Sequence, residues 1–92
     1  MRVNRQRKTM KREELYQRFG KAIAHYRVAV DLTQAELATK IKRPRSYVNN
    51  VEGGWQRVYL ADVFTLAKAL GLDPTVFINE IAHGVTYEDK KG

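Results

Sequence analysis

The sequence contains no cysteine, which excludes disulfides, thiolate metal sites and a cysteine nucleophile. Its two histidines, His25 and His83, lie far apart in the chain, and neither has a second ligand at the spacing of a metal site. A glycine-rich phosphate-binding loop is also missing. We therefore expect no catalytic residues, no metal and no cofactor, and predict that the protein is not an enzyme.

Long hydrophobic runs are absent as well. No apolar stretch approaches the ~18 residues that a membrane span needs. The basic segment 1–12 is not followed by the apolar stretch of a signal peptide. The sequence therefore predicts a cytoplasmic protein, and its 92 residues are a length typical of one domain.

Positive charge is unevenly distributed along the chain, which has 17 Lys and Arg, 10 Asp and Glu, and a net charge of +7. Residues 1–12 carry six basic residues and no acid, residues 34–58 carry five basic and two acidic residues, and residues 59–92 are net acidic. A one-sided basic surface suits a polyphosphate partner, because neutralising phosphates releases counterions. Charge alone leaves open a generally basic soluble protein, or an arm on an anionic membrane. The arm has almost no apolar stripe, so we expect no membrane partner.

Apolar residues recur with the period of a helix, and no stretch alternates like a strand. The predicted fold class is all-α, with one five-helix domain over residues 13–84 between a basic, flexible arm (1–12) and a polar tail (85–92). The helices are expected at about residues 11–28, 33–41, 44–52, 60–70 and 73–82.

Capping residues support these boundaries. Thr33 and Glu36 form a capping-box pattern at the start of the second helix. Asp31 is a candidate left-handed residue after the first helix. Pro44 is expected at the first position of the third helix, and Gly53-Gly54 is expected to end that helix with positive φ. The second helix, a three-residue turn and the third helix have the spacing of a helix-turn-helix.

Three segments within this pattern stand in a recognisable order: Leu32-Thr-Gln-Ala-Glu-Leu-Ala38, Ser46-Tyr-Val-Asn-Asn-Val-Glu52 and Leu66-Ala-Lys-Ala-Leu-Gly71. With them the chain resembles the lambda-repressor-like (Xre-type) helix-turn-helix family over about residues 16–78. It departs from the family in the turn, where Lys42 replaces a common glycine. The resemblance implies a five-helix lambda-repressor-like DNA-binding domain whose third helix enters the major groove.

The outward face of the third helix carries the predicted base-reading residues. With Val48 and Val51 facing inward, the opposite face holds Arg45, Ser46, Asn49 and Asn50. Arginine can donate two hydrogen bonds to guanine, and asparagine can pair with adenine. The alternative is an ordinary solvated helix face.

Phosphate contacts are expected around this helix. The resemblance implies one from Gln34, at the start of the second helix, where free backbone amides also attract anions. The other predicted phosphate contacts are Arg43, Tyr47, Gln56 and Arg57. For Trp55 two interpretations remain open: its indole covers the corner between the third and fourth helices, or its N–H contacts a phosphate.

Two further sets have expected structural roles. The resemblance implies a structural ion pair between Arg27 and Glu52. The fifth helix is short and carries Phe77, Ile78 and Ile81, which we predict to form a homodimer interface, although some of them must fill the monomer core. Two-fold dimers commonly bind paired half-sites.

The predicted function is sequence-specific binding of double-stranded DNA by a small transcriptional regulator, which we expect to be a repressor. Two narrower roles fit the same residues, an antitoxin-autorepressor with a toxin partner and a restriction–modification controller. An alternative of another class is a helix-turn-helix adaptor that binds protein, but such an adaptor would more commonly expose apolar residues on its third helix.

Overall fold

The computed structural model describes residues 11–83, and within this range it contains five α-helices and no strand. The helices are α1 (Arg12–Ala29), α2 (Gln34–Ile41), α3 (Arg45–Glu52), α4 (Leu60–Ala69) and α5 (Pro74–Ala82). The predicted all-α class is confirmed, and each helix end lies within one residue of its predicted place. Only the last two residues of the predicted arm, Lys11 and Arg12, are described. The rest of the arm and the predicted tail lie outside the described residues, so the domain boundaries stay predictions.

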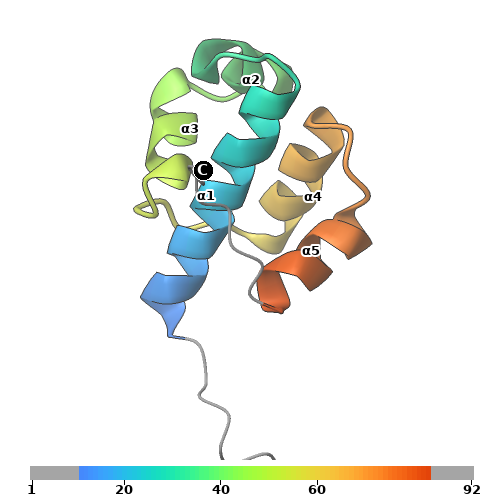
Figure 1. The fold of residues 1–92 in the computed structure, drawn as a ribbon. Coiled ribbons are helices and arrows are strands. Elements are labelled where there is room, and N and C mark those ends of the chain that lie inside the picture. The colour runs from blue at the N-terminus through green and yellow to red at the C-terminus, as the bar shows by residue number, and fades with distance from the viewer. Residues whose placement is uncertain (1–10, 84–92) are drawn as a thin grey trace, which may run out of the picture.

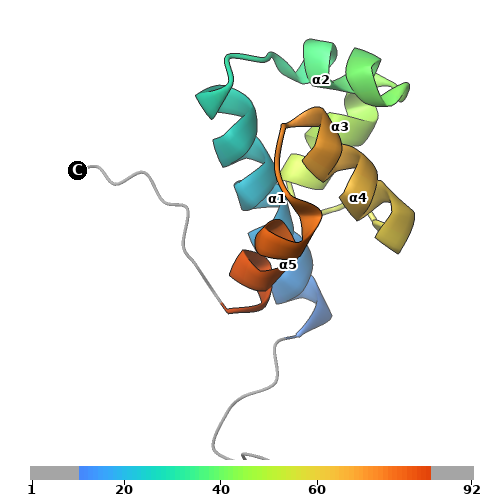
Figure 2. The same cartoon turned by 90° about the vertical axis from the view of Figure 1, so that its right-hand side faces the viewer.

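The long helix α1 runs along the molecule and contacts α3 and α5 (Figure 1). Helices α2 and α3 lie together at one end of the molecule, and α5 lies at the other (Figure 2). Helix α4 contacts both α2 and α5. None of the helices between residues 11 and 83 is long and apolar enough to cross a membrane.

Each helix contributes apolar side chains to a single core. The buried members are Phe19, Ala22, Ile23, Leu37, Ala38, Ile41, Tyr47, Val48, Val51, Leu66, Ala67, Leu70, Phe77 and Ile81. At the α1–α5 contact the rings of Phe19 and Phe77 lie with their centroids 5.7 Å apart. The predicted inward positions of α3, Val48 and Val51, are both in this core. The core thereby fixes which face of α3 remains outside.

Three predicted features of the helix ends have different outcomes in the structure. The capping box of α2 is confirmed: the Thr33 hydroxyl accepts from the Glu36 amide at 3.0 Å, and the Glu36 carboxylate accepts from the Thr33 amide at 2.8 Å. Asp31 has the predicted left-handed backbone, with φ 59°. The prediction for Pro44 is wrong by one position, because its ψ of 154° is extended and α3 begins at Arg45.

The end of α3 also differs from its prediction. Gly53 has φ −82°, and only Gly54 takes positive φ, at 82°. A side chain at Gly54 would lie 2.9 Å from Cγ of Gln17, so the chain after α3 lies directly against α1.

Gly20 allows α1 and α3 to approach each other closely. It is buried in α1, and a methyl group there would overlap the carbonyl oxygen of Val51 and lie 2.8 Å from the carbonyl oxygen of Glu52. Both oxygens belong to the last turn of α3, which cannot shift without moving the whole helix. This glycine therefore sets the distance between the two helices.

We expect Gly20→Ala to lower the free energy of unfolding by about 3 kcal/mol, because overpacking against backbone atoms outweighs the better helix propensity of alanine. Lys21→Ala, at the exposed neighbouring position, is the matched control and should change stability little. Urea unfolding followed by circular dichroism measures both variants. Equal stability of Gly20→Ala and the unmodified protein would contradict the close approach of α1 and α3.

Candidate nucleic-acid interface

The turn between α2 and α3 consists of Lys42, Arg43 and Pro44. Lys42 takes the left-handed conformation, with φ 60°, where many helix termini use glycine. Its amide donates to the carbonyl of Thr39 at 3.2 Å, and the amide of Arg43 donates to the carbonyl of Ala38 at 3.0 Å. These two hydrogen bonds close the C-terminal end of α2, and the turn then leads into α3.

The outward face of α3 is polar. Arg45, Ser46, Asn49 and Asn50 are all exposed, as expected for the side opposite Val48 and Val51. Their side chains form no hydrogen bond or ion pair with any other residue in the range 11–83. The face thus presents one guanidinium, one hydroxyl and two amide groups, which can donate to or accept from base edges. Base reading by these residues stays a prediction.

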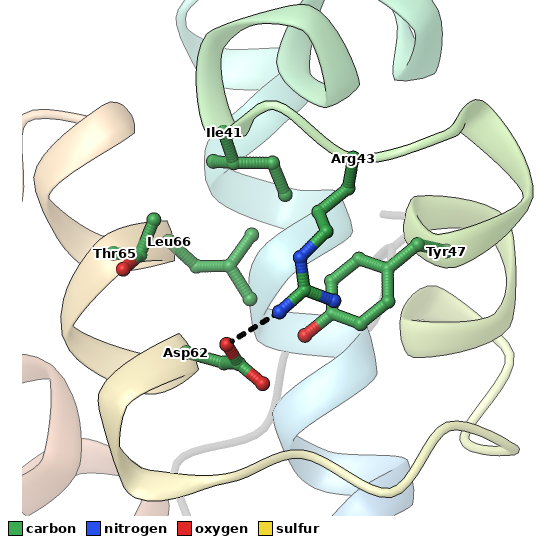
Figure 3. Close-up of a pocket in the computed structure, with 6 residues that line it drawn as sticks. All are labelled: Ile41, Arg43, Tyr47, Asp62, Thr65 and Leu66. Carbon is green, nitrogen blue, oxygen red and sulfur yellow. Dashed lines mark hydrogen bonds and ion pairs between the residues drawn. The ribbon is translucent and has the colours of Figure 1, made fainter.

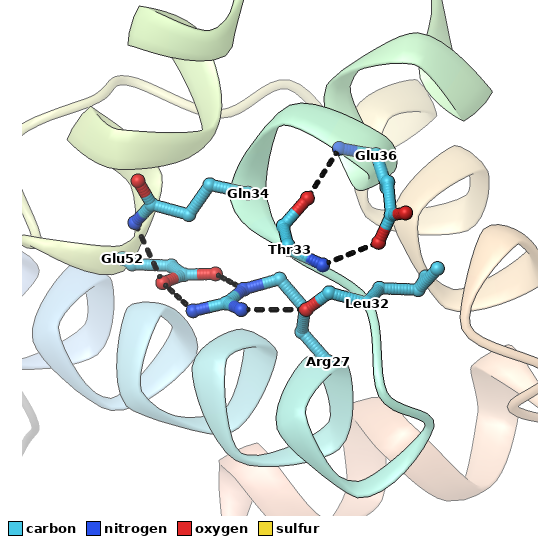
Figure 4. Close-up of polar contacts among 6 residues, drawn as sticks. All are labelled: Arg27, Leu32, Thr33, Gln34, Glu36 and Glu52. Atoms are coloured by element: carbon cyan, nitrogen blue, oxygen red, sulfur yellow. Dashed lines mark hydrogen bonds and ion pairs between the residues drawn. The ribbon is translucent and has the colours of Figure 1, made fainter.

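An ion pair joins the end of α3 to α1 (Figure 4). Arg27 donates to both carboxylate oxygens of Glu52, at 2.7 and 3.0 Å, and its third nitrogen donates to the carbonyl of Leu32 at 2.7 Å. Both side chains are largely buried, with 14% and 9% exposed. The hydrogen bonds to Glu52 raise the pKa of the Arg27 guanidinium above its usual value, against the opposing effect of burial. The predicted pair is present, and it joins α1 and α3 to the segment before α2.

Gln34 belongs to the same group of contacts. Its amide nitrogen Nε2 donates to Oε1 of Glu52 at 3.0 Å, so this side chain fastens the first turn of α2 to the last turn of α3 (Figure 4). The side chain is half-buried. An amide nitrogen has two N–H donors. Gln34 uses one of these N–H donors for Glu52, so the predicted phosphate contact of Gln34 would need the second N–H donor.

Arg43 is held by two residues of neighbouring helices (Figure 3). Its guanidinium lies over the ring of Tyr47, 4.3 Å from the centroid, and donates to the carboxylate of Asp62 at 2.9 Å. Asp62 also accepts from the backbone amide of Tyr59 and so caps α4. The predicted phosphate contact of Arg43 therefore competes with an internal carboxylate. Sequence reasoning missed this role of Asp62, because its partner is 19 positions away and no local pattern joins them.

Tyr47 lies inside the molecule rather than on the flank of α3. Only 8% of it is exposed, and its hydroxyl is shielded from solvent and has no hydrogen-bond partner within residues 11–83. Burial, followed by the negative charge of Asp62, raises the pKa of Tyr47 to about 12. The predicted phosphate contact of Tyr47 conflicts with this placement, since the hydroxyl cannot reach a phosphate unless the side chain moves. The ring instead supports Arg43.

The loop after α3 contains the remaining predicted phosphate contacts. Arg57 is exposed and has no side-chain partner among the described residues, whereas Gln56 donates to the carbonyl of Arg57 at 3.1 Å. Trp55 is 84% exposed, so the interpretation in which its indole covers the corner between α3 and α4 is wrong.

The predicted dimer residues divide between core and surface. Phe77 and Ile81 are 1% and 6% exposed, because α5 packs them against α1 and α4. They fill the monomer core and present almost no surface to a partner, which corrects their assignment to an interface. Ile78 is 37% exposed and lies on the rim of an open apolar groove with Leu15 and Leu60.

No group of three or more His, Asp or Glu side chains that could hold a metal ion occurs in residues 11–83. The two histidines are both exposed. His25 lies in α1, and His83 follows the end of α5. Chemically, the arrangement offers hydrogen-bond donors and acceptors on one helix face, with positive charge beside them.

Comparisons with known proteins agree with this geometry. A helix-turn-helix domain family matches residues 18–77, more than half of the chain. The restriction-modification controller protein C.AhdI from Aeromonas hydrophila is 35% identical, with 67% of this chain and 94% of that chain covered and a TM-score of 0.64.

Two further solved structures are similar. The clp gene regulator ClgR from Corynebacterium glutamicum is 25% identical, covers 75% of this chain and 73% of its own, and has a TM-score of 0.70. The controller protein C.Esp1396I, solved as a tetramer with its natural 35 base-pair operator, is 22% identical, covers 75% of this chain and 91% of its own, and shares the fold with a TM-score of 0.68. No curated protein matches the chain.

We expect Tyr47→Phe to leave stability unchanged or to raise it by up to about 1 kcal/mol at pH 7, because it removes a buried hydroxyl without a partner and keeps the ring under Arg43. The folded-state pKa of Tyr47 is about 12, and an unfolded tyrosine titrates near 10. The contribution of the protonated phenol to the free energy of unfolding is therefore complete below pH ~10 and is lost as the pH rises toward 12. Urea unfolding between pH 7 and 11.5 measures both proteins. The unmodified protein should lose more stability than the variant above pH ~10, and parallel curves would contradict the burial of the phenol.

Proposed function

The chain belongs to the helix-turn-helix domain family, and on this premise we propose that it is a small transcriptional regulator that reads the major groove of double-stranded DNA with α3. The single observation that carries the proposal is the outward face of α3. Its four polar side chains are exposed and unoccupied by other residues in the range 11–83, while the opposite side of the same helix is buried. A helix of this kind fits the width of the major groove.

Differences among the arginines support separate roles. Arg27 and Arg43 are paired with carboxylates of the same molecule, whereas Arg45 on α3 and Arg57 in the following loop are exposed and have no such partner among the described residues. Arg45, Ser46, Asn49 and Asn50 are the proposed base-reading set. Arg57, with Gln56 and the second N–H of Gln34, is proposed to contact phosphates, and Arg43 joins them if a phosphate displaces Asp62.

A protein-binding adaptor fits the structure less well. An adaptor would present apolar side chains on α3, but the exposed residues of this helix are all polar or charged. We also propose that the protein acts without catalysis and in the cytoplasm, where its DNA partner lies.

A narrower role finds support in one comparison. Similarity to the controller protein C.AhdI extends over nearly the whole of that protein, which favours control of a restriction–modification operon for this chain. An antitoxin-autorepressor with a toxin partner uses the same fold, and the neighbouring gene distinguishes the two roles.

We propose that the protein binds its site as a homodimer, because one short reading helix contacts few base pairs. The surface we assign to the dimer is the exposed rim of the apolar groove, with Ile78, Leu15 and Leu60, in place of the buried Phe77 and Ile81. This rim is formed by α1, α4 and α5, and α5 lies at the end of the molecule away from α2 and α3 (Figure 1).

We expect Arg45→Ala to weaken binding to the preferred duplex by about 1–3 kcal/mol and to relax the preference at one base pair in each half-site, because a bidentate contact to guanine is lost. The charge-matched control is Arg57→Ala, which should weaken preferred and scrambled duplexes alike and make the salt dependence shallower. Fluorescence anisotropy with labelled duplexes at several salt concentrations measures both. Equal losses for Arg45→Ala on preferred and scrambled duplexes would contradict base reading by Arg45.

A further inference from the structure

Trp55 is the single tryptophan of the chain and the most exposed of the large apolar side chains that the structure describes. At 84% exposure, its indole presents nearly its whole surface to solvent. Aromatic side chains of this size usually bury most of their area in a core or an interface. The position of the indole beside the reading helix therefore needs a physical reason.

The backbone of Trp55 is anchored to α3. Its amide donates to the carbonyl of Asn50 at 2.9 Å, and the next amide, that of Gln56, donates to the same oxygen at 3.2 Å. The preceding amide of Gly54 donates to the carbonyl of Val51 at 3.1 Å. The loop thus holds the tryptophan directly beside Asn50, at the end of the proposed base-reading face.

The direction of the indole is also limited. A methyl group built on Gly53 would lie 2.8 Å from Cδ1 and 3.1 Å from Nε1 of Trp55, so one edge of the indole rests on this glycine. The backbone of Gly53, with φ −82°, is one that alanine readily adopts. The space above Gly53 is therefore filled by the indole, and a side chain there would displace it.

We propose that Trp55 is a DNA-contacting residue whose indole packs against the deoxyribose–phosphate backbone next to the bases that Asn50 faces. The inference rests on the proposed function and adds an apolar contact to a polar face. DNA is favoured as the occupant because the indole rests on Gly53, which follows Asn49 and Asn50 at helical spacing, and because Arg57, two residues further on, is exposed and has no side-chain partner in residues 11–83. A contact to sugar and phosphate carries no direct base information, so this contact adds affinity to both preferred and scrambled duplexes.

The first measurement uses Trp55 as its own reporter. Because the chain has no other tryptophan, iodide quenching of its fluorescence reports this indole alone. We expect the quenching constant of the full-length protein to fall several-fold when saturating duplex is added, and to stay constant when the protein is concentrated without DNA. Shielding at high protein concentration without DNA would assign the indole to a contact between two copies and would overturn the proposal.

The second measurement compares the affinities of variants. Trp55→Ala should weaken binding to both duplexes by about tenfold, because the apolar area that the indole buries is lost, and Trp55→Phe should recover part of this loss, because a smaller ring keeps some of the packing. Phe64→Ala, which removes an exposed aromatic side chain from α4, is the matched control and should bind like the unmodified protein. Circular dichroism and thermal unfolding check that each variant folds.

Gly53→Ala tests the position of the indole without removing it. It should weaken binding about threefold by pushing the ring aside, and adding it to Trp55→Ala should cause no further loss. Unchanged affinity of Trp55→Ala together with unchanged iodide quenching, in an unmodified protein that binds duplex, would overturn the contact and leave the proposed function standing. An unmodified protein that binds no duplex at all would overturn the proposed function itself.

Discussion

The ion pair between Arg27 of α1 and Glu52 of α3 is the contact on which the orientation of the reading helix depends. Arg27 also holds the carbonyl of Leu32, and Gln34 donates to the same carboxylate, so α1, the start of α2 and the end of α3 meet at one point. Removing one partner of a largely buried pair leaves an uncompensated charge, which is more costly than losing a surface pair. Gly20 sets the distance between α1 and α3, and the ion pair links the two helices near their C-terminal ends.

The orientation of α3 in turn separates two kinds of polar residue. Groups such as Glu52 and the pair of Arg43 and Asp62 have charged partners within the molecule. Groups on the outer face of α3, such as Arg45 and Asn49, are exposed, and their side chains have no partner in residues 11–83. The buried side of α3, with Val48 and Val51, holds the helix backbone in place, and the exposed donors and acceptors extend from it to solvent.

Features that depend on neighbours in the sequence could be predicted from it. The capping box of Thr33 and Glu36, the left-handed Asp31 and the outward face of α3 follow from local hydrogen bonds and helical period. Contacts between distant segments could not be predicted in this way. The pairing of Arg43 with Asp62, the burial of Tyr47 and the packing of Phe77 and Ile81 into the core all depend on how α4 and α5 lie against the other helices. The ion pair of Arg27 and Glu52 is also distant, and only the family resemblance pointed to it.

Selection of bound fragments from a pool of random DNA duplexes tests the central claim most directly, because it assumes no operator. The account predicts enrichment of one motif arranged as an inverted repeat, with half-site centres about 10 base pairs or a multiple of that distance apart, as two reading helices related by a two-fold axis require. A single enriched half-site would retain base reading by α3 and contradict the homodimer. Recovery of fragments with no common motif would contradict the claim that α3 reads DNA sequence.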